Sequence, residues 1–139
     1  MVVTMKNKLD FPNDFKYSKS HEYLKLVNNK QAVIGITSYA SSELGDIVYI
    51  ELPEVGKSFK VGERFGVIES VKSVSELYIP SSGRIIEINK DLSDHPEYIN
   101  QDTYGKGWMI KIELTSDANQ NKDLISADEY SKFVLAEAP

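Results

Sequence analysis

The feature that most constrains this fold is a pair of β-prone runs with a lysine between them, Gly66-Val67-Ile68-Glu69-Ser70-Val71-Lys72-Ser73-Val74-Ser75-Glu76-Leu77-Tyr78. Side chains alternate in character along the first run, and the second is rich in β-branched and aromatic residues. We expect the runs to pair as a hairpin that turns about Val71-Lys72, which places the lysine ammonium in solvent. A catalytic lysine generally needs burial or a neighbouring cation, so Lys72 is interpreted as a presented amine.

A lysine at a hairpin tip is usually an ordinary surface residue, but here its neighbours match a known pattern. Residues 65–73 resemble the lipoylation segment of the H protein of the glycine cleavage system, usually written Val-Glu-Ser-Val-Lys with a small residue after it. Further similar segments follow in the family's order, at residues 20–23, 35–40, 44–53, 80–83, 100–102 and 104–108. Together they span residues 17–133, which is most of the chain.

The resemblance implies that lipoic acid acylates the ε-amine of Lys72 and forms a flexible arm. That arm would accept an aminomethyl group from the glycine decarboxylase (P protein) and offer it to the aminomethyltransferase (T protein). Dihydrolipoyl dehydrogenase (L protein) would then reoxidise it. One tethered arm that visits several active sites replaces free encounter with a search at high local concentration.

The residues themselves indicate a carrier and not an enzyme. The sequence has no cysteine nucleophile, no glycine-rich phosphate loop before a helix and no Ser-His-Asp set that can be positioned. With two histidines and no cysteine in the chain, no metal site is predicted.

Four further residues are candidates for the site, all through the resemblance. The family is described as parking the loaded arm in a shallow cleft, and by position Ser20, Glu22 and Glu76 would line that cleft. The alternative for these three is an ordinary solvated strand residue. Glu69 resembles the acidic residue by which lipoate-attaching enzymes recognise their target.

Three positions depart from the family's pattern without touching the acceptor lysine. Tyr23 stands where Trp is usual, Ser38 where Asp is common and Thr103 where Pro is common. These departures put fine contacts with a particular partner in doubt, not the carrier assignment.

Other carriers remain as alternatives. A lipoyl domain of a 2-oxoacid dehydrogenase typically shows Asp-Lys-Ala and is shorter, and a biotin carrier shows Met-Lys-Met, whereas Val71 and Ser73 flank Lys72 here. An H-like relay that passes lipoyl groups to other proteins would present the same lysine.

The expected fold is mainly β: a barrel-sandwich hybrid, or hammerhead, of two packed sheets with short peripheral helices and a C-terminal helix. We expect one domain over residues 1–139, with a lead-in at 1–15, a β-sandwich core at 16–114 and the helix at 126–137. Phe11 and Phe15 are the expected anchors of the lead-in.

Local signals place the helices and the last strand of this fold. Thr37 or Ser38 can begin a short helix that Gly45 ends. The Ser-x-x-Glu spacing at residues 126–129 is a capping box for the C-terminal helix. Trp108 opens an alternating run, residues 108–114, and is expected on its buried side.

The charge and the composition restrict the partners and the compartment. A formal net charge of −5 over 139 residues argues against non-specific nucleic-acid binding, so the partners should be proteins. The absence of cysteine excludes disulfides and fits a reducing compartment. Residues 1–10 contain no apolar run that could be a signal peptide or a membrane span. We expect a cytoplasmic monomer without membrane attachment, with a mature organellar protein as the alternative.

Overall fold

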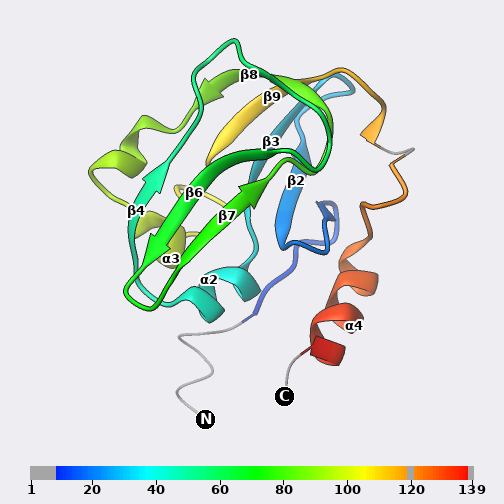
Figure 1. The fold of residues 1–139 in the computed structure, drawn as a ribbon. Coiled ribbons are helices and arrows are strands. Elements are labelled where there is room, and N and C mark those ends of the chain that lie inside the picture. Colours follow the sequence, from blue (N-terminus) through cyan, green and yellow to red (C-terminus); the bar gives the residue numbers. More distant parts are fainter. Residues whose placement is uncertain (1–8, 119–120, 138–139) are drawn as a thin grey trace.

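The structure is a computed structural model that describes residues 9–118 and 121–137, and its strands form two antiparallel sheets (Figure 1). The larger sheet has the order β1-β2-β3-β9-β8-β5, with β1 at Lys16–Tyr17, β2 at Glu22–Leu26, β3 at Gln31–Ile36, β9 at Ile110–Leu114, β8 at Gly83–Ile88 and β5 at Ser58–Phe59. The smaller sheet has the order β4-β6-β7, with β4 at Ile47–Glu51, β6 at Arg64–Ser70 and β7 at Val74–Tyr78. The helices are α2 (Ser38–Leu44), the 3-10 turn η1 (Lys90–Ser93), α3 (Tyr98–Gln101) and α4 (Ala127–Glu137).

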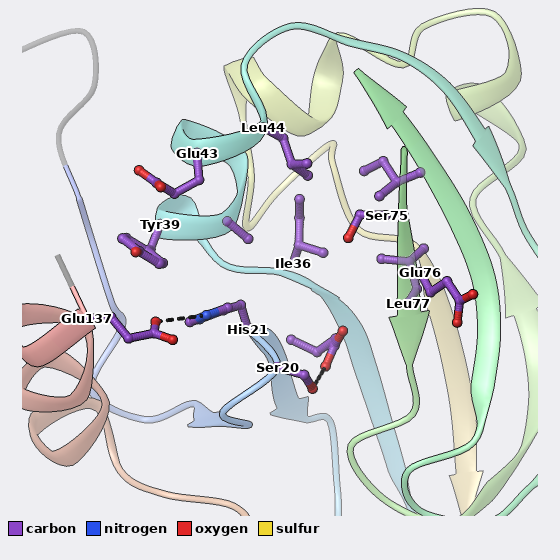
Figure 2. A pocket seen from close by; sticks show the side chains of 13 residues that line it. Ser20, His21, Ile36, Tyr39, Glu43, Leu44, Ser75, Glu76, Leu77 and Glu137 are labelled. Atoms are coloured by element: carbon purple, nitrogen blue, oxygen red, sulfur yellow. Dashed lines mark hydrogen bonds and ion pairs between the residues drawn. The ribbon is translucent and has the colours of Figure 1, made fainter. Parts of the chain in front are cut away.

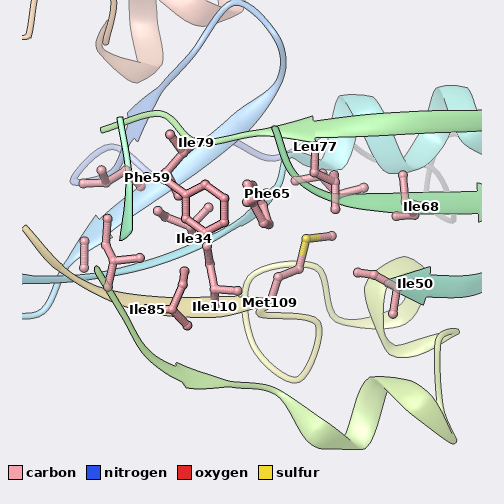
Figure 3. Packing of buried hydrophobic residues seen from close by; sticks show 14 of the residues in the cluster. Ile34, Ile50, Phe59, Phe65, Ile68, Leu77, Ile79, Ile85, Met109 and Ile110 are labelled. Carbon is pink, nitrogen blue, oxygen red and sulfur yellow. The ribbon is translucent and has the colours of Figure 1, made fainter. Parts of the chain in front are cut away.

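The main core fills the space between the two sheets (Figure 3). Alternate residues of each strand point inward, so Ile34 and Ile110 of the larger sheet belong to one buried cluster with Ile68 and Leu77 of the smaller. The predicted mainly-β fold of two packed sheets with short helices is confirmed, although the strands do not close into a barrel.

The helix ends lie where the local signals predict. Thr37 is the N-cap of α2, and its hydroxyl accepts a hydrogen bond of 3.2 Å from the amide of Ala40. Gly45 ends that helix with a φ of 78°. At α4 the hydroxyl of Ser126 accepts from the amide of Glu129 at 3.2 Å, and the Glu129 carboxylate accepts from the Ser126 amide at the same distance. Among the described residues, no helix has the length and apolar character needed to cross a bilayer.

A second cluster attaches the lead-in and α4 to the larger sheet. The Tyr130 ring of α4 stacks on Tyr17 of β1 at 4.8 Å between centroids, and Phe11 meets Tyr130 edge-on at 4.9 Å. Phe15 packs in the same cluster beside Tyr23. Phe11 and Phe15 are therefore the anchors that the sequence predicts, while residues 1–8 of the lead-in lie outside the described residues.

The expectation for Trp108 is wrong. The side-chain amide of Asn89 donates to the carbonyls of Lys106 and Trp108, at 2.8 and 2.7 Å, and holds this segment as a loop. The strand consequently begins at Ile110, Met109 takes the fully buried position, and Trp108 is left partly exposed.

Close approach of two strands makes Gly66 a test of this packing. A Cβ at residue 66 would overlap the carbonyl oxygen of Glu51 on the neighbouring strand. Gly66→Ala should therefore lower the free energy of unfolding by about 1–3 kcal/mol, measured by urea denaturation. Val74→Ala, a 65% exposed position on the adjacent strand, is the control and should change it by less than about 0.5 kcal/mol. Equal stability of Gly66→Ala and the parent would contradict the close packing.

Candidate functional site

The lysine occupies a tight turn at the end of the β6–β7 hairpin. Glu69 pairs with Val74, and the amide of Ser70 donates to the carbonyl of Ser73 at 2.8 Å, which leaves Val71 and Lys72 as the two central residues. This is the turn that the sequence predicts.

Three hydrogen bonds fix the backbone of this turn. The hydroxyl of Ser70 accepts from the amides of Lys72 and Ser73, both at 3.1 Å. The amide of Val71 donates to the carbonyl of Asp46 at 3.0 Å, which ties the turn to the segment between α2 and β4. Lys72 is therefore carried on a well-supported backbone.

The Lys72 side chain is exposed and lies beside the end of α2. A Cβ added at Gly45 would stand 3.4 Å from the Lys72 Cε atom, an ordinary van der Waals distance, so the lysine side chain passes close to this glycine. Within the described part of the chain, Lys72 forms no ion pair. Its amine is therefore accessible for modification.

A pocket of about 370 Å³ lies between β2, α2, β7 and the end of α4 (Figure 2). Leu44, one of its lining residues, directly precedes Gly45 in the chain. The predicted cleft residues Ser20, Glu22 and Glu76 all line it, but only Ser20 and Glu22 are hydrogen-bonded to each other there. The side chain of Glu76 lies on the outward side of β7, and its carboxylate points away from the pocket in Figure 2. Glu69 does not line the pocket, since it pairs with Tyr49 and shares the outward side of the smaller sheet.

The pocket has an apolar side and a polar side. Its apolar lining comes from both sheets and from α2, and its other walls carry three carboxylates. The apolar residues include Ile36, Leu44, Ile68 and Leu77, and the carboxylates belong to Glu22, Glu43 and Glu137. This arrangement suits a ligand with an apolar chain and a cationic end.

Glu22 is the most deeply buried of these carboxylates, with 1% of its surface exposed. One carboxylate oxygen accepts from the hydroxyls of Ser18, at 2.8 Å, and Ser20. The other accepts from the amide of Tyr78 at 3.2 Å. Burial disfavours the charged form more than these bonds favour it, and raises the pKa of Glu22 to about 7. The alternative of a solvated strand residue is therefore wrong for Glu22.

A chain of hydrogen bonds holds α4 at the edge of the pocket. Nδ1 of His21 lies 2.7 Å from the Tyr130 hydroxyl, which lies 2.7 Å from the hydroxyl of Thr37. Nε2 of His21 lies 3.2 Å from the Glu137 carboxylate, as the dashed line in Figure 2 marks. Burial lowers the pKa of His21, while Glu137 opposes that shift. In the neutral ring, a proton on Nε2 donates to Glu137 and Nδ1 accepts from Tyr130.

The sequence reasoning missed several lining residues. His21 lies inside the Ser-His-Glu segment, but nothing there indicates its left-handed backbone, with φ at 75°. Tyr39 and Glu43 lie four residues apart on one helix, so the predicted helix could have placed them on one face. No signal in the sequence places Glu137 at the pocket.

Glu22 predicts a specific pH dependence of stability. Its folded-state pKa of about 7 exceeds the ordinary value of 4.5, so the folded protein binds this proton more tightly than the unfolded chain. The contribution is favourable below about pH 4.5 and is lost as the pH rises through about 7. Glu22→Gln removes it, so the stability of the parent relative to this variant should fall by up to about 3 kcal/mol between pH 4.5 and pH 8.

The measurement is urea denaturation of both proteins across this pH range. Glu43→Gln, an exposed carboxylate of the same pocket, is the matched control and should keep the pH slope of the parent. Parallel curves for the parent and Glu22→Gln would contradict the raised pKa.

Comparison with known proteins connects this site to a family. The family model described as glycine cleavage H-protein matches residues 15–137. A glycine cleavage system H protein of Staphylococcus epidermidis is 54% identical over 123 residues, covering 88% of this chain and 96% of that protein. A glycine cleavage system H protein of Halalkalibacterium halodurans is 52% identical over 128 residues, covering 92% of this chain and 98% of that protein. The crystal structure of a glycine cleavage system H protein from Mycobacterium marinum superposes with a TM-score of 0.81 at 37% identity, covering 88% of this chain and 97% of that one. The chain therefore belongs to the glycine cleavage H-protein family.

Proposed function

We propose that Lys72 is the residue on which this family member carries its lipoyl group, and that the pocket beside it receives the end of that arm. The observation that supports this most directly is the exposed Lys72 on a fixed two-residue turn, with its side chain beside Gly45, which follows the pocket-lining Leu44 in the chain. The protein acts as a carrier in the glycine cleavage system, and the chemistry belongs to its partner enzymes.

The surroundings of Lys72 fit a lipoyl group. The amine is exposed, and the lysine side chain passes Gly45 without a side chain between them. When bound, the lipoyl group supplies a dithiolane that is reduced while it takes up a one-carbon amine fragment and is then reoxidised. Apolar lining from Ile68 and Leu77 matches the hydrocarbon part of such an arm.

The polar side of the pocket provides a binding site for a protonated amine. Glu22 of the larger sheet and Ser20, just before it in the chain, are hydrogen-bonded to each other at the pocket, and Glu43 of α2 and Glu137 of α4 add carboxylates to its lining. Glu76 is a candidate through the resemblance alone, since its side chain lies on the outward side of β7. Carboxylates in a partly enclosed space attract a cation more strongly than the same groups in open water. We infer that these side chains bind and orient the loaded end of the arm, and that the apolar wall keeps water from it.

The proposed partners are the enzymes of the glycine cleavage system and those that modify the lysine. They are the glycine decarboxylase, the aminomethyltransferase, dihydrolipoyl dehydrogenase and a lipoate-attaching enzyme, with Glu69 serving in recognition by the last. We propose that the protein acts in the cytoplasm as a monomer whose single hairpin tip is presented to each partner in turn.

The test is the intact mass of the protein after co-expression with a lipoate ligase and supplied lipoate. The parent should gain one lipoyl group and Lys72→Ala none, because the ε-amine is the acceptor. Lys30→Ala, which removes an exposed lysine from the β2–β3 turn, is the matched control and should be modified as the parent is.

Modification of Lys72→Ala, or of neither protein while a known acceptor is modified, would overturn the assignment. Glycine–bicarbonate exchange with the decarboxylase then separates two carrier roles. Exchange by the lipoylated parent supports glycine cleavage, and no exchange supports a relay that passes lipoyl groups to other proteins.

A further inference from the structure

The loop that joins β1 to β2 holds a histidine where the backbone favours glycine. The amide of Ser18 donates to the carbonyl of Glu22 at 2.9 Å, so residues 19–21 form a three-residue hairpin loop. The last residue of such a loop commonly adopts a left-handed conformation, which glycine and asparagine occupy most easily. His21 has this conformation, and it is the one non-glycine residue with a positive φ among the residues that the structure describes. A costly backbone conformation of this kind indicates that the side chain has a role.

Both nitrogens of the His21 ring contact one helix. Nδ1 lies 2.7 Å from the hydroxyl of Tyr130, and Figure 2 shows the ring reaching toward Glu137 through Nε2. Tyr130 and Glu137 are about two turns apart, so they lie on the same side of α4. The ring also packs against Tyr39 of α2, with 5.0 Å between centroids. This one side chain therefore joins the hairpin loop to both helices that border the pocket.

The hydrogen bonds that begin at α2 run in one direction through the ring. The amide of Ala40 donates to the hydroxyl of Thr37, which is then free to donate to the hydroxyl of Tyr130. With a proton on Nε2 of His21, the Tyr130 hydroxyl donates to Nδ1. Nε2 in turn donates to the carboxylate of Glu137. Each hydrogen in the chain then has an acceptor.

A second proton on the ring would break this order. Both nitrogens of His21 would donate, so the Tyr130 hydroxyl would have to accept from Nδ1 and donate to Thr37. The buried Thr37 hydroxyl would then hold a hydrogen without an acceptor in the chain, which costs free energy. Burial of the ring acts in the same direction and lowers the pKa of His21. The neutral ring is therefore the form that holds α4.

The titratable groups around His21 come from α2, from α4 and from its own hairpin. Among the described residues they are Tyr39 and Glu43 of α2, Tyr130 and Glu137 of α4, and Lys19 and Glu22 in the flanking chain. The carboxylates of Glu43 and Glu137 favour the protonated ring, but both are exposed to solvent and burial of the ring outweighs them.

We propose that His21 is a positioning residue of the pocket. Its neutral ring, with the proton on Nε2, holds the end of α4 as one wall and fixes the loop on which Ser20 lies. The inference rests on the proposed function of the pocket. Release of this wall admits water to the loaded end of the arm, so His21 determines how long the one-carbon amine fragment is kept.

The first test is amide hydrogen exchange in residues 131–137 of the lipoylated protein. His21→Asn suits the left-handed backbone but is too short to reach Glu137, and Tyr130→Phe keeps the stacked ring without its hydroxyl. We expect exchange to be about fivefold to tenfold faster in each variant at neutral pH, because hydrogen bonds to α4 are lost. Tyr17→Phe removes a neighbouring hydroxyl, which donates to the carbonyl of Pro12, and should exchange as the parent does.

The pH profile separates positioning from packing. The contribution of the neutral ring is present above about pH 6.5 and is lost as the pH falls and the ring is protonated. After correction for the intrinsic exchange rate, protection of α4 in the parent should fall in this range, while His21→Asn shows no such fall. Glu22 titrates in both proteins, so its effect cancels in the comparison. Parallel profiles would overturn the proposal.

The second test follows the loaded arm. The reduced lipoyl group is loaded with formaldehyde and ammonium, which joins the carbon to sulfur and nitrogen with loss of water. In hydrolysis the oxygen of water becomes that of formaldehyde, and the C–S and C–N bonds break with their electron pairs on sulfur and nitrogen. The two protons of water go to the thiol and to the ammonium. We expect His21→Asn to release ammonium about fivefold to tenfold faster than the parent, and Tyr17→Phe to match the parent.

Each outcome supports or overturns a particular claim. Unchanged exchange and release in His21→Asn and Tyr130→Phe would overturn the role of His21. Faster exchange with the release rate of the parent would show that α4 does not shelter the arm, and would also overturn it. Release from the parent as fast as from the same adduct of free dihydrolipoamide would overturn the proposed function of the pocket, and this inference with it. Thermal melting shows whether each variant keeps its fold, and Tyr130→Phe decides the matter if His21→Asn does not.

Discussion

The buried carboxylate of Glu22 connects the two sheets at the pocket. Glu22 belongs to β2 of the larger sheet, and the amide of Tyr78, which donates to it, ends β7 of the smaller. A carboxylate with 1% of its surface exposed is costly in free energy, and its hydrogen bonds from the segment before β2 offset only part of that cost. The spacing of the sheets at this point, and hence the width of the pocket, depends on this contact.

Local sequence signals were sufficient for much of the fold. The hairpin turn, the ends of α2 and the capping box of α4 are each decided by residues within a few positions of one another, so the sequence predicts them. The backbone of His21 and the exposure of Trp108 are decided by distant partners: Thr37 donates to the carbonyl of His21, and Asn89 holds that of Trp108. Such contacts have no short-range signature, which is why the left-handed residue was missed and the tryptophan was misplaced.

The candidate site likewise has parts that could be predicted from the sequence and parts that depend on distant contacts. The resemblance predicts Lys72 and three cleft residues, of which Ser20 and Glu22 meet at the pocket, but it does not predict the contribution of α4, because Glu137 is far from them in sequence. The departures from the family pattern lie inside the molecule and close to one another. The hydroxyl of Tyr23 donates to the carbonyl of Thr103 at 3.2 Å, and the hydroxyl of Tyr104 lies 3.1 Å from that of Ser38. Tyr23 and Ser38 therefore contact the same loop, residues 103 and 104, and the three departures lie in one internal neighbourhood.

The hydrogen bonds around Ser70 have a consequence for any group attached to Lys72. Because they hold the backbone on both sides of the lysine, and Asp46 holds the turn from behind, rotation is confined to the bonds of the side chain and of whatever it carries. The attachment point thus behaves as a pivot fixed in the frame of the protein. A partner that binds the body of the molecule therefore also fixes the position from which the arm extends. The orientation in which the carrier binds then determines which part of the partner the end of the arm can reach.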